Sequence, residues 1–448
     1  GSRRHYSFSH SGYLEQSKRI TEIIAQRYGE NPYVQAWQTD NEYGCHETTY
    51  SWCHSSLREF RLWLQKRYSS IEKLNESWGN VFWSMEYNSF DEIELPNLTV
   101  TEANPSHNFD FCRFSSYQVR KFNLAQVEII NKYSPGRPVS HNYMGHFTEF
   151  DHREVSQDLE IAAWDSYPLG FLQNMQVIAR EDKKLLQECY RIGDPDFQAY
   201  HHDLYRGMGR LWVMEQQPGP VNWAKYNPIP VKGAVRLWSW EAFAHDAEVV
   251  SYFRWRQAPY AQEQMHAGLM YRDNTPAPGQ EEAKQVSEEL KKIEIPATEQ
   301  STIALVHDFE ACWMTELDGQ THDFHYTRLL LDFYKAVRMN GGSLDIIGKN
   351  ADFTGYKLVI VPSFVHFQEE DLQRVIKSGA QILAGPRTGT KTPDFQLPPE
   401  LSLEGLGFQV RRVDALPRDL PVPVEWNGVK GNFSVWREHG LTSGVSEG

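Results

Sequence analysis

Short β-rich runs alternate with amphipathic helical stretches from residue 14 to about residue 295. The expected strands are residues 34–39, 138–142, 161–165, 211–214 and 249–254. The helical stretches between them include 57–68, 115–133 and 234–245. This alternation predicts βαβ units and a parallel sheet. Polar residues follow each strand, as in DNE at 40–42, and side chains gathered at the carboxyl ends of parallel strands are typical of a (β/α)8 TIM barrel.

Five expected strands are too few for a closed barrel of eight. A barrel without three of its strands would have open edges and an unfilled core. Either some strands escape this reading, or the chain begins inside the barrel. We favour the second explanation, because only a short segment precedes the strand at 34–39. The expected fold class is therefore α/β, with a TIM barrel that is incomplete at its N-terminal side.

A second α/β pattern follows a polar helix and linker at 283–300. Its strands are expected at 302–307, 344–347, 357–361 and 381–384, and its helices at 323–338 and 369–377. This pattern predicts a doubly wound sheet. It has no GxGxxG fingerprint, and Pro362 and Ser363, not a cysteine, follow the strand 357–361, so we expect a structural role. From about residue 395 the chain is rich in proline and then β-like.

Charge and cysteine content exclude several classes of protein. Asp and Glu (59) outnumber Lys and Arg (45), which gives a formal net charge of −14 and disfavours nucleic-acid binding. The apolar runs fall short of the ~18 residues of a membrane span. Five cysteines are too few, and odd in number, for a disulfide framework. With no visible export signal either, we expect a cytoplasmic protein that binds neither nucleic acid nor membrane.

Two glutamates stand where expected strands end. Glu42 follows the strand 34–39, and Glu215 comes directly after the strand 211–214. In a parallel barrel both would lie on the same rim. Glycoside hydrolysis needs two carboxyl groups beside one glycosidic bond, in different protonation states. One glutamate at a strand end is usually just a solvated or ion-paired carboxylate, but two on one rim favour a glycosidase.

Several segments resemble glycoside hydrolase family 42, a family of β-galactosidases. Residues 37–44 (WQTDNEYG) resemble its acid/base motif, and residues 214–223 (MEQQPGPVNW) its nucleophile segment. Its last strand and sugar-binding loop resemble 253–257 (FRWRQ) and 263–266 (EQMH), and the end of its third barrel strand resembles 1–6 (GSRRHY). The segments follow the family's order. The resemblance implies a fragment that lacks the N-terminal part of the barrel and part of the C-terminal domain.

The resemblance also implies a division of the chain. Residues 1–295 would be the catalytic barrel, with the end of strand 3 and strands 4 to 8. Residues 296–395 would be an α/β domain of the trimerisation type, and residues 396–448 the start of a small C-terminal β domain. In the family the middle domain helps to build a homotrimer whose subunits help to wall each other's active sites. We therefore expect a homotrimer.

The resemblance assigns chemical roles to four residues. Glu42 would be the general acid and then the general base, and Glu215 the nucleophile of a retaining double displacement. Asn41 would hydrogen-bond the sugar 2-hydroxyl, and Tyr167 would hold the Glu215 carboxylate in orientation. The implied substrate is a terminal, non-reducing β-D-galactosyl residue.

The remaining candidates would bind the sugar. Trp223 would offer an aromatic face to the apolar side of galactose. Glu263 and His266, three residues apart, would lie on one face of a helical turn and contact the 4- and 6-hydroxyls. Arg3 matches a sugar-contacting arginine, with Arg4 beside it, and Phe253 would line the pocket.

The sequence departs from the family at a metal site. Some members hold a structural zinc ion with four cysteines, and the corresponding positions here are Ser7, Ser51, Cys53 and Ser56. Serine hydroxyls do not replace thiolates as ligands of structural zinc. An alternative cluster of Cys45, His46, Cys53 and His54 would need adjacent ligands on one tetrahedral ion. We expect no metal and no cofactor, since the retaining mechanism requires no metal.

Two other functions stay open. The missing strands would suit a catalytically silent galactoside-binding or scaffold protein, although Glu42 and Glu215 are both present. The same chemistry could also act on α-L-arabinopyranosides or β-D-fucosides, which share the 4-hydroxyl configuration of galactose and lack its 6-hydroxyl. Contacts from Glu263 and His266 would then decide, because an unpaired buried polar group penalises the poorer ligand.

Overall fold

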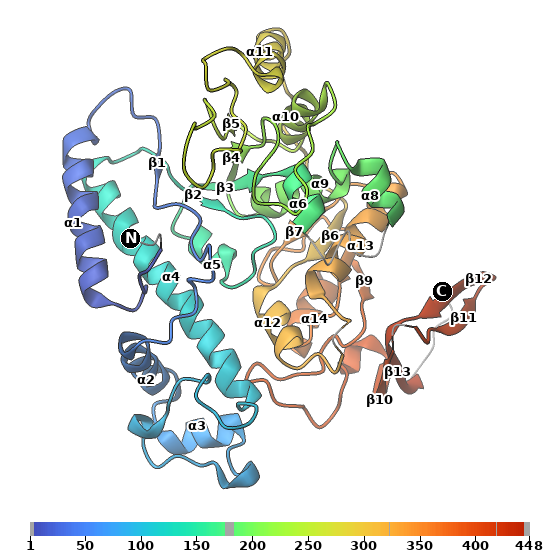
Figure 1. Cartoon of the computed structure of the whole chain (residues 1–448). Helices are drawn as coiled ribbons and strands as arrows, with labels where there is room; N and C mark the ends of the chain where they lie inside the picture. The colour runs from blue at the N-terminus through green and yellow to red at the C-terminus, as the bar shows by residue number, and fades with distance from the viewer. Residues whose placement is uncertain (1–3, 175–182, 322, 418, 443–448) are drawn as a thin grey trace.

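A computed structural model describes residues 4–174, 183–321, 323–417 and 419–442 of the chain. Five parallel strands form one sheet in chain order, β1-β2-β3-β4-β5 (Figure 1). Their bounds are Trp37–Gln38, Val139–Tyr143, Ile161–Ser166, Arg210–Gln216 and Val249–Tyr252. Each coincides with or overlaps a strand expected from the sequence. The sheet is part of a (β/α)8 barrel whose carboxyl ends all point to one rim.

Strand β1 is shorter than the expected strand 34–39. Only Trp37 and Gln38 lie in the ladder, opposite Val139 and Ser140 of β2. The N–H of Val34 instead donates to the carbonyl of Asn31 at 3.1 Å. The chain is therefore still turning at Val34, and pairing begins three residues later than the apolar run suggests.

Helices connect the strands and cover the sheet. The expected helices 57–68 and 234–245 correspond to α2 and α10, and the expected helix 115–133 is the second half of α4. Helix α4 starts earlier because Pro105 occupies its first turn and the Asn104 side chain accepts the N–H of Ser106 at 2.9 Å. Among the residues that the structure describes, the α-helices of this part are α1 (Ser11–Tyr28), α2 (His54–Tyr68), α3 (Ile71–Trp78), α4 (Pro105–Tyr133), α5 (His152–Ser156), α6 (Pro168–Asn174), α8 (Lys183–Cys189), α9 (Pro195–Arg206), α10 (Ala234–Ala244) and α11 (Pro278–Leu290).

The second α/β unit is doubly wound, as expected. Its four parallel strands run in the order β7-β6-β8-β9, with bounds Asp345–Ile347, Ile303–Val306, Leu358–Val361 and Gln381–Ala384. Helices α12 (Phe309–Leu317), α13 (Tyr326–Met339) and α14 (Glu369–Lys377) accompany them. Ser363, which follows β8, is fully buried.

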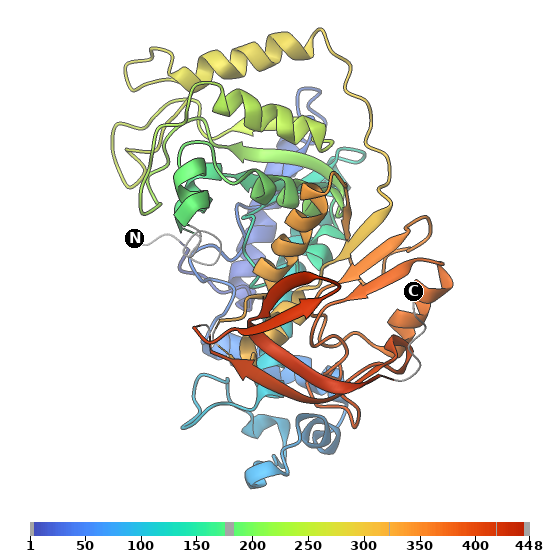
Figure 2. The same cartoon turned by 90° about the vertical axis from the view of Figure 1, so that its right-hand side faces the viewer.

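The C-terminal part consists of two antiparallel pairs. Strand β10 (Phe408–Leu416) pairs with β13 (Val435–Thr442), and β11 (Val422–Trp426) pairs with β12 (Val429–Phe433). Figure 2 shows these ribbons lying against the second α/β unit. The same view shows the extended segment that runs from the end of α11 down the outside of the molecule to β6. In the described part of the chain, helices are too short or too polar to cross a membrane.

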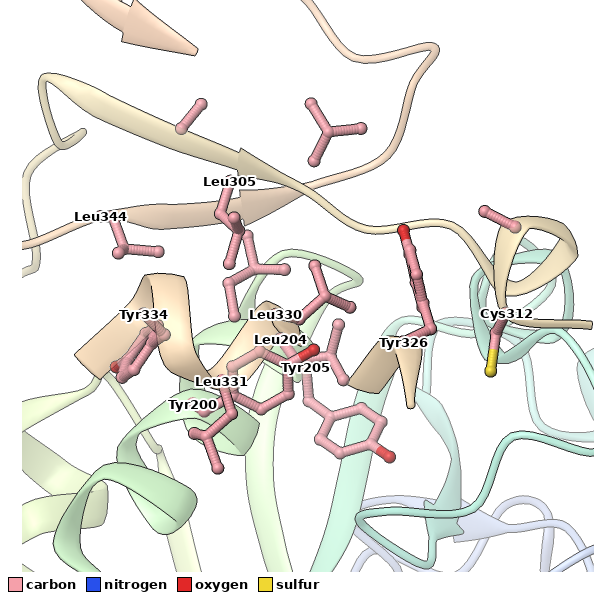
Figure 3. Packing of buried hydrophobic residues seen from close by; sticks show 14 of the residues in the cluster. Tyr200, Leu204, Tyr205, Leu305, Cys312, Tyr326, Leu330, Leu331, Tyr334 and Leu344 are labelled. Atoms are coloured by element: carbon pink, nitrogen blue, oxygen red, sulfur yellow. The ribbon is translucent and has the colours of Figure 1, made fainter. Parts of the chain in front are cut away.

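The barrel and the second unit share one hydrophobic core. Leu204 and Tyr205 of α9 belong to the same buried cluster as Leu330 and Tyr334 of α13 (Figure 3). The cluster continues into strand β6, for example at Leu305. Because these side chains are almost completely buried, separating the two units would expose their shared apolar surface to water.

Polar contacts reinforce this junction. Lys335 and Arg338 of α13 pair with two aspartates at the start of α9, Asp194 at 2.7 Å and Asp196 at 2.8 Å. On the other side, Arg113 of α4 forms two bonds to Glu310 of α12, at 2.5 and 2.8 Å. Two-pronged arginine–carboxylate pairs fix orientation as well as distance. The second unit is therefore held rigidly against the barrel.

Candidate active site

A β-bulge sets two carboxyl groups side by side at the rim. Strand β3 pairs with β4 so that Trp164 lies opposite Val213 and the next residue, Asp165, lies opposite Glu215. The register therefore skips Met214. A bulge re-aims the side chains that follow it, and here it makes Asp165 and Glu215 direct neighbours on adjacent strands.

Glu42 reaches the same rim from the loop after β1. Its backbone has a positive φ of 46°, and that of Asp40 is 49°, values that residues with a side chain seldom adopt. Three contacts hold this strained loop. The carbonyl of Glu42 accepts from Nη1 of Arg4 at 2.6 Å, and the N–H of Glu42 donates to Oδ1 of Asn142 at 3.2 Å. The N–H of Tyr43 donates to Nε2 of His141 at 3.1 Å. Such strain persists where surrounding structure over-determines it, typically at functional sites.

The side chain of Glu42 has its own partners. Its Oε2 accepts from Nη2 of Arg4 and from Nδ2 of Asn41, both at 3.2 Å. The Arg4 side chain is 5% exposed and that of Glu42 18%. One oxygen thus faces a nearly buried cation and an amide, while the group still has access to solvent.

Three carboxyl groups meet at this rim. One oxygen each of Glu42, Asp165 and Glu215 lie within 4.8 Å of one another. A set of three carboxylate oxygens is the kind of ligand group that binds a hard cation. Two carboxyl groups at this spacing also suit acid/base and nucleophilic work on one bond.

Tyr167 is bonded to Glu215. Its hydroxyl donates to Oε2 of Glu215 at 2.5 Å. Tyr167 is 5% exposed, and burial together with the negative charge of Glu215 raises the pKa of the phenol well above its usual value. The phenol therefore keeps its proton and remains a donor, as expected for a residue that orients the carboxylate.

Aromatic side chains form a wall beside Glu215. The ring of Trp223 meets that of Tyr167 edge to face, with centroids 5.6 Å apart, and remains 40% exposed. It packs directly on Gly170, where a Cβ atom would come within 2.4 Å of the ring. A half-exposed ring fixed on one side is suited to stack against a ligand, which is the role expected for Trp223.

His266 and Phe253 complete this wall. The ring of His266 lies 5.7 Å from that of Tyr167 and 5.2 Å from that of Phe253. Burial, helped by Arg254, lowers the pKa of His266 to about 4, so the imidazole is neutral at pH 7. Its Nε2 is buried and has no hydrogen-bond partner in the described part of the chain, so it is an unsatisfied polar atom beside this wall.

Glu263 lies on the same turn, because the N–H of His266 donates to the carbonyl of Glu263 at 3.0 Å. Its carboxylate is paired with Arg254 and is 43% exposed. Sequence reasoning placed Glu263 next to His266 but did not foresee Arg254. Arg254 therefore holds the Glu263 carboxylate in place for any contact with a sugar.

Arg4, Asn142 and Asp165 lie at this site but were not among the residues predicted from the sequence. Arg3, the expected sugar-contacting arginine, lies outside the described residues, and its neighbour Arg4 binds Glu42. Asn142 and Asp165 were also missed, although each is the last residue but one of a strand next to one that carries a candidate. Their position at the carboxyl ends of parallel strands was the available signal.

The four residues that the sequence resemblance aligns with zinc ligands, Ser7, Ser51, Cys53 and Ser56, lie close together. Ser7 Oγ lies 3.4 Å from Ser56 Oγ, and Cys53 Sγ lies 3.4 Å from Ser51 Oγ and 3.7 Å from Ser56 Oγ. One thiol and three hydroxyls do not fit structural zinc, which takes thiolate and imidazole ligands. Burial raises the pKa of the Cys53 thiol, but hydrogen bonds from these hydroxyls and a backbone N–H outweigh it and bring the pKa to about 6.

Parallel strands that bring paired carboxyl groups and an aromatic wall to one rim define a glycoside hydrolase of the TIM-barrel class. Residues 1–293 match the model of glycoside hydrolase family 42, described as β-galactosidase, and residues 301–444 match that of the β-galactosidase trimerisation domain. The chain belongs to this family, the β-galactosidases of glycoside hydrolase family 42.

Relatives agree along almost the whole chain. A β-galactosidase of Thermus thermophilus is 50% identical over 446 residues, which are 98% of this chain and 68% of the relative. The crystal structure of a β-galactosidase from the psychrophilic Marinomonas ef1 has a TM-score of 0.95 at 48% identity, over 99% of this chain and 69% of that one. The β-galactosidase of Halorubrum lacusprofundi has a TM-score of 0.94 at 39% identity, over 99% and 67%. The chain thus spans about two thirds of the length of these relatives.

Proposed function

We propose that the chain hydrolyses terminal β-D-galactosides by a retaining double displacement, with Glu215 as nucleophile and Glu42 as acid and base. The observation that carries this proposal is the approach of Glu42 and Glu215 oxygens to within 4.8 Å. Retaining enzymes hold their carboxyl groups roughly 5–5.5 Å apart, whereas inverting enzymes leave roughly 6.5–9.5 Å for a water molecule. The spacing supports the retaining mechanism.

In the first step, the Glu215 carboxylate attacks the anomeric carbon while the bond to the leaving oxygen breaks. Glu42 gives its proton to that oxygen. In the second step, the Glu42 carboxylate takes a proton from water, whose oxygen attacks the anomeric carbon and releases Glu215. Tyr167 holds the ionised carboxylate of Glu215 in line for attack.

Asn41 and Arg4 act around Glu42. The Asn41 amide donates to Oε2 of Glu42 and accepts from Asn142 at 3.0 Å, so its orientation is fixed for a contact to the sugar 2-hydroxyl. The Arg4 guanidinium stabilises the carboxylate that Glu42 becomes after it protonates the leaving group. In this assignment Arg4 takes the place that the sequence motif gave to Arg3.

Galactose is the proposed sugar because the matched relatives are β-galactosidases and the rim offers suitable groups. Trp223 presents a half-exposed face, His266 has a buried ring nitrogen without a partner among the described residues, and both rings contact that of Tyr167. We also propose that the chain assembles as a homotrimer, because residues 301–444 match a trimerisation domain.

Hydrolysis of para-nitrophenyl β-D-galactopyranoside by the wild-type chain and by Glu215→Ala tests the proposal. The variant should lose activity by a factor of roughly 10⁴ or more, and added azide should then yield α-galactosyl azide. Glu248→Ala is the matched control, because Glu248 lies at the opposite, amino-terminal end of β5 in a pair with Arg210. Unchanged activity of Glu215→Ala, or a β-configured azide product, would overturn the nucleophile assignment.

A further inference from the structure

Asp165 is a third carboxyl group that the two-carboxylate mechanism does not use. Asp165 is 1% exposed, and the pairing of β3 with β4 places it opposite Glu215. Its Oδ2 accepts from Nδ2 of Asn142 at 2.9 Å. Its Oδ1 is buried without a hydrogen-bond partner among the described residues. A buried carboxylate anion with one free oxygen is energetically costly.

The groups that face Asp165 make a negative charge there still less favourable. Glu215 of β4 and Glu42 of the β1 loop approach within 4.8 Å, and both are acidic. A negative charge on Asp165 also raises the pKa of the phenols of Tyr167 and Tyr205. Arg4 is directed to Glu42 instead. Burial first, and then the charges of Glu215 and Glu42, raise the pKa of Asp165 well above its usual value.

We propose that Asp165 is a positioning residue that works as an uncharged carboxylic acid, held through Asn142, and that it limits the three-carboxyl cluster to one negative charge in the working enzyme. This proposal rests on the proposed function of Glu42 and Glu215. The carbonyl oxygen is Oδ2, which accepts from Asn142, and the proton resides on Oδ1.

Asn142 passes this constraint on to the acid/base residue. Its Nδ2 donates both to Oδ2 of Asp165 and to Oδ1 of Asn41, and its Oδ1 accepts the backbone N–H of Glu42. The acceptor on Asp165 therefore fixes which way the Asn142 amide points. That orientation in turn holds the strained Glu42 backbone and the Asn41 side chain in place.

The charge limit matters for the reaction itself. Glu215 must be ionised to attack, while Glu42 must hold a proton to give away. A second fixed negative charge within 4.8 Å would disfavour ionisation of Glu215. An uncharged Asp165 supplies the polar contact to Asn142 without that penalty.

The first test compares pH–rate profiles of the wild type, Asp165→Asn and Asp165→Ala. Asparagine keeps the carbonyl acceptor and cannot ionise, so kcat should stay within roughly threefold of wild type and neither limb of the profile should move to lower pH. Alanine removes the acceptor, so kcat should fall roughly tenfold or more while KM changes less. If Asp165 were an anion, the Asn variant would remove a negative charge beside both catalytic glutamates and shift both limbs downward by about one pH unit, which would overturn the proposal.

The second test needs no catalytic activity. A carboxyl group whose folded-state pKa is raised weakens the fold progressively as pH rises above its unfolded value of about 4. The Tm of Asp165→Asn minus that of wild type should therefore increase between pH 5 and pH 8. Asp194→Asn is the control, since Asp194 is also buried, at 4% exposed, but is paired with Lys335 at 2.7 Å, and its Tm should lie below wild type without any such gain.

These two tests separate the two proposals. If the wild type hydrolyses no galactoside, the proposed function fails, whereas the melting curves still report whether Asp165 is charged. A Tm difference that stays flat for Asp165→Asn would overturn the inference even in an active enzyme. If Asp165→Asn does not fold, Asp165→Ser, which is also unable to ionise, replaces it for the melting curves and for the position of the two pH limbs, with the same expected directions.

Discussion

The hydroxyl of Tyr167 and the carboxylate of Glu215 are joined by a hydrogen bond of 2.5 Å between groups that come from neighbouring strands. Tyr167 follows the end of β3, and Glu215 is the last residue but one of β4. The phenol is buried and keeps its proton, so it donates to the carboxylate in every state in which Glu215 is ionised. The bond restricts the rotation of the carboxylate about its own axis.

Replacing Tyr167 with phenylalanine should therefore lower kcat more than it raises KM. A hydrogen bond to a charged group contributes roughly 1.5–3 kcal/mol, which corresponds to a loss of roughly 10- to 100-fold. The acid limb of the pH–rate profile should move to higher pH, because removal of the donor disfavours the ionised carboxylate. Steady-state kinetics across pH check both effects. Tyr260→Phe, at an exposed tyrosine, is the control, and equal losses in the two variants would contradict the role of Tyr167.

Replacing Glu42 with alanine should affect substrates unequally. Poor leaving groups need the proton that Glu42 gives, so lactose hydrolysis should fall far more than hydrolysis of dinitrophenyl galactoside. Added azide should rescue the second step and yield the β-configured azide, because attack on the glycosyl-enzyme restores the original configuration. Glu47→Ala, at an exposed glutamate of the same loop, should behave as wild type. Parallel losses on both substrates would refute the acid/base assignment.

Arg4 and Arg3 can be told apart by matched variants. Arg4 makes two bonds to Glu42, at 2.6 and 3.2 Å, and its loss should lower kcat/KM roughly 100-fold. Arg4→Lys should recover part of this, since lysine keeps the charge and loses the two-pronged geometry. Arg58→Ala serves as the surface control. A larger loss in Arg3→Ala than in Arg4→Ala would return the assignment to Arg3, as the sequence motif had it.

Cys53 should be the fast-reacting thiol of the described chain. With a pKa of about 6 it is mostly thiolate at pH 7, and it is exposed, whereas burial raises the pKa of Cys112 to about 12. Iodoacetamide labelling followed by mass spectrometry should show a rate that rises through pH 6 and levels off above pH 7. Ser51→Ala, which removes one donor to the thiolate, should shift this rise to higher pH. Elemental analysis should find no stoichiometric zinc, and one ion per chain would refute the interpretation of this cluster.

Much of the fold could be predicted because its signals are local. The strand Gln381–Ala384 and the helix Glu369–Lys377 coincide with the expected ranges, since apolar spacing alone defines them. Strand β1 is an exception, because the turn that the N–H of Val34 closes on Asn31 is not visible in an apolar run. The division at residues 295 and 395 stays a prediction.

The site was predictable only where residues lie in a recognisable string. Glu42, Asn41, Glu215 and Trp223 stand in such strings, and the structure brings them to one rim or its wall. Asp165 and Asn142 do not, because their importance depends on a bulge that aligns β3 with β4 and on an amide shared across three chain segments. Which residues of two strands lie opposite each other cannot be predicted from the short sequence around either residue. The pairing of Arg254 with Glu263 is not predictable for a similar reason, because the two residues stand in separate segments of the chain.

The hydrophobic core shared by α9 and α13 has a consequence for how the chain denatures. Unfolding of either half would expose apolar side chains of the other half to water. Heating should therefore give one cooperative calorimetric transition that includes both halves. A protease that cuts the extended segment between α11 and β6 should leave two polypeptides that still travel together on a gel-filtration column. Such a cut would break the chain without separating its two parts, which would stay associated and unfold together.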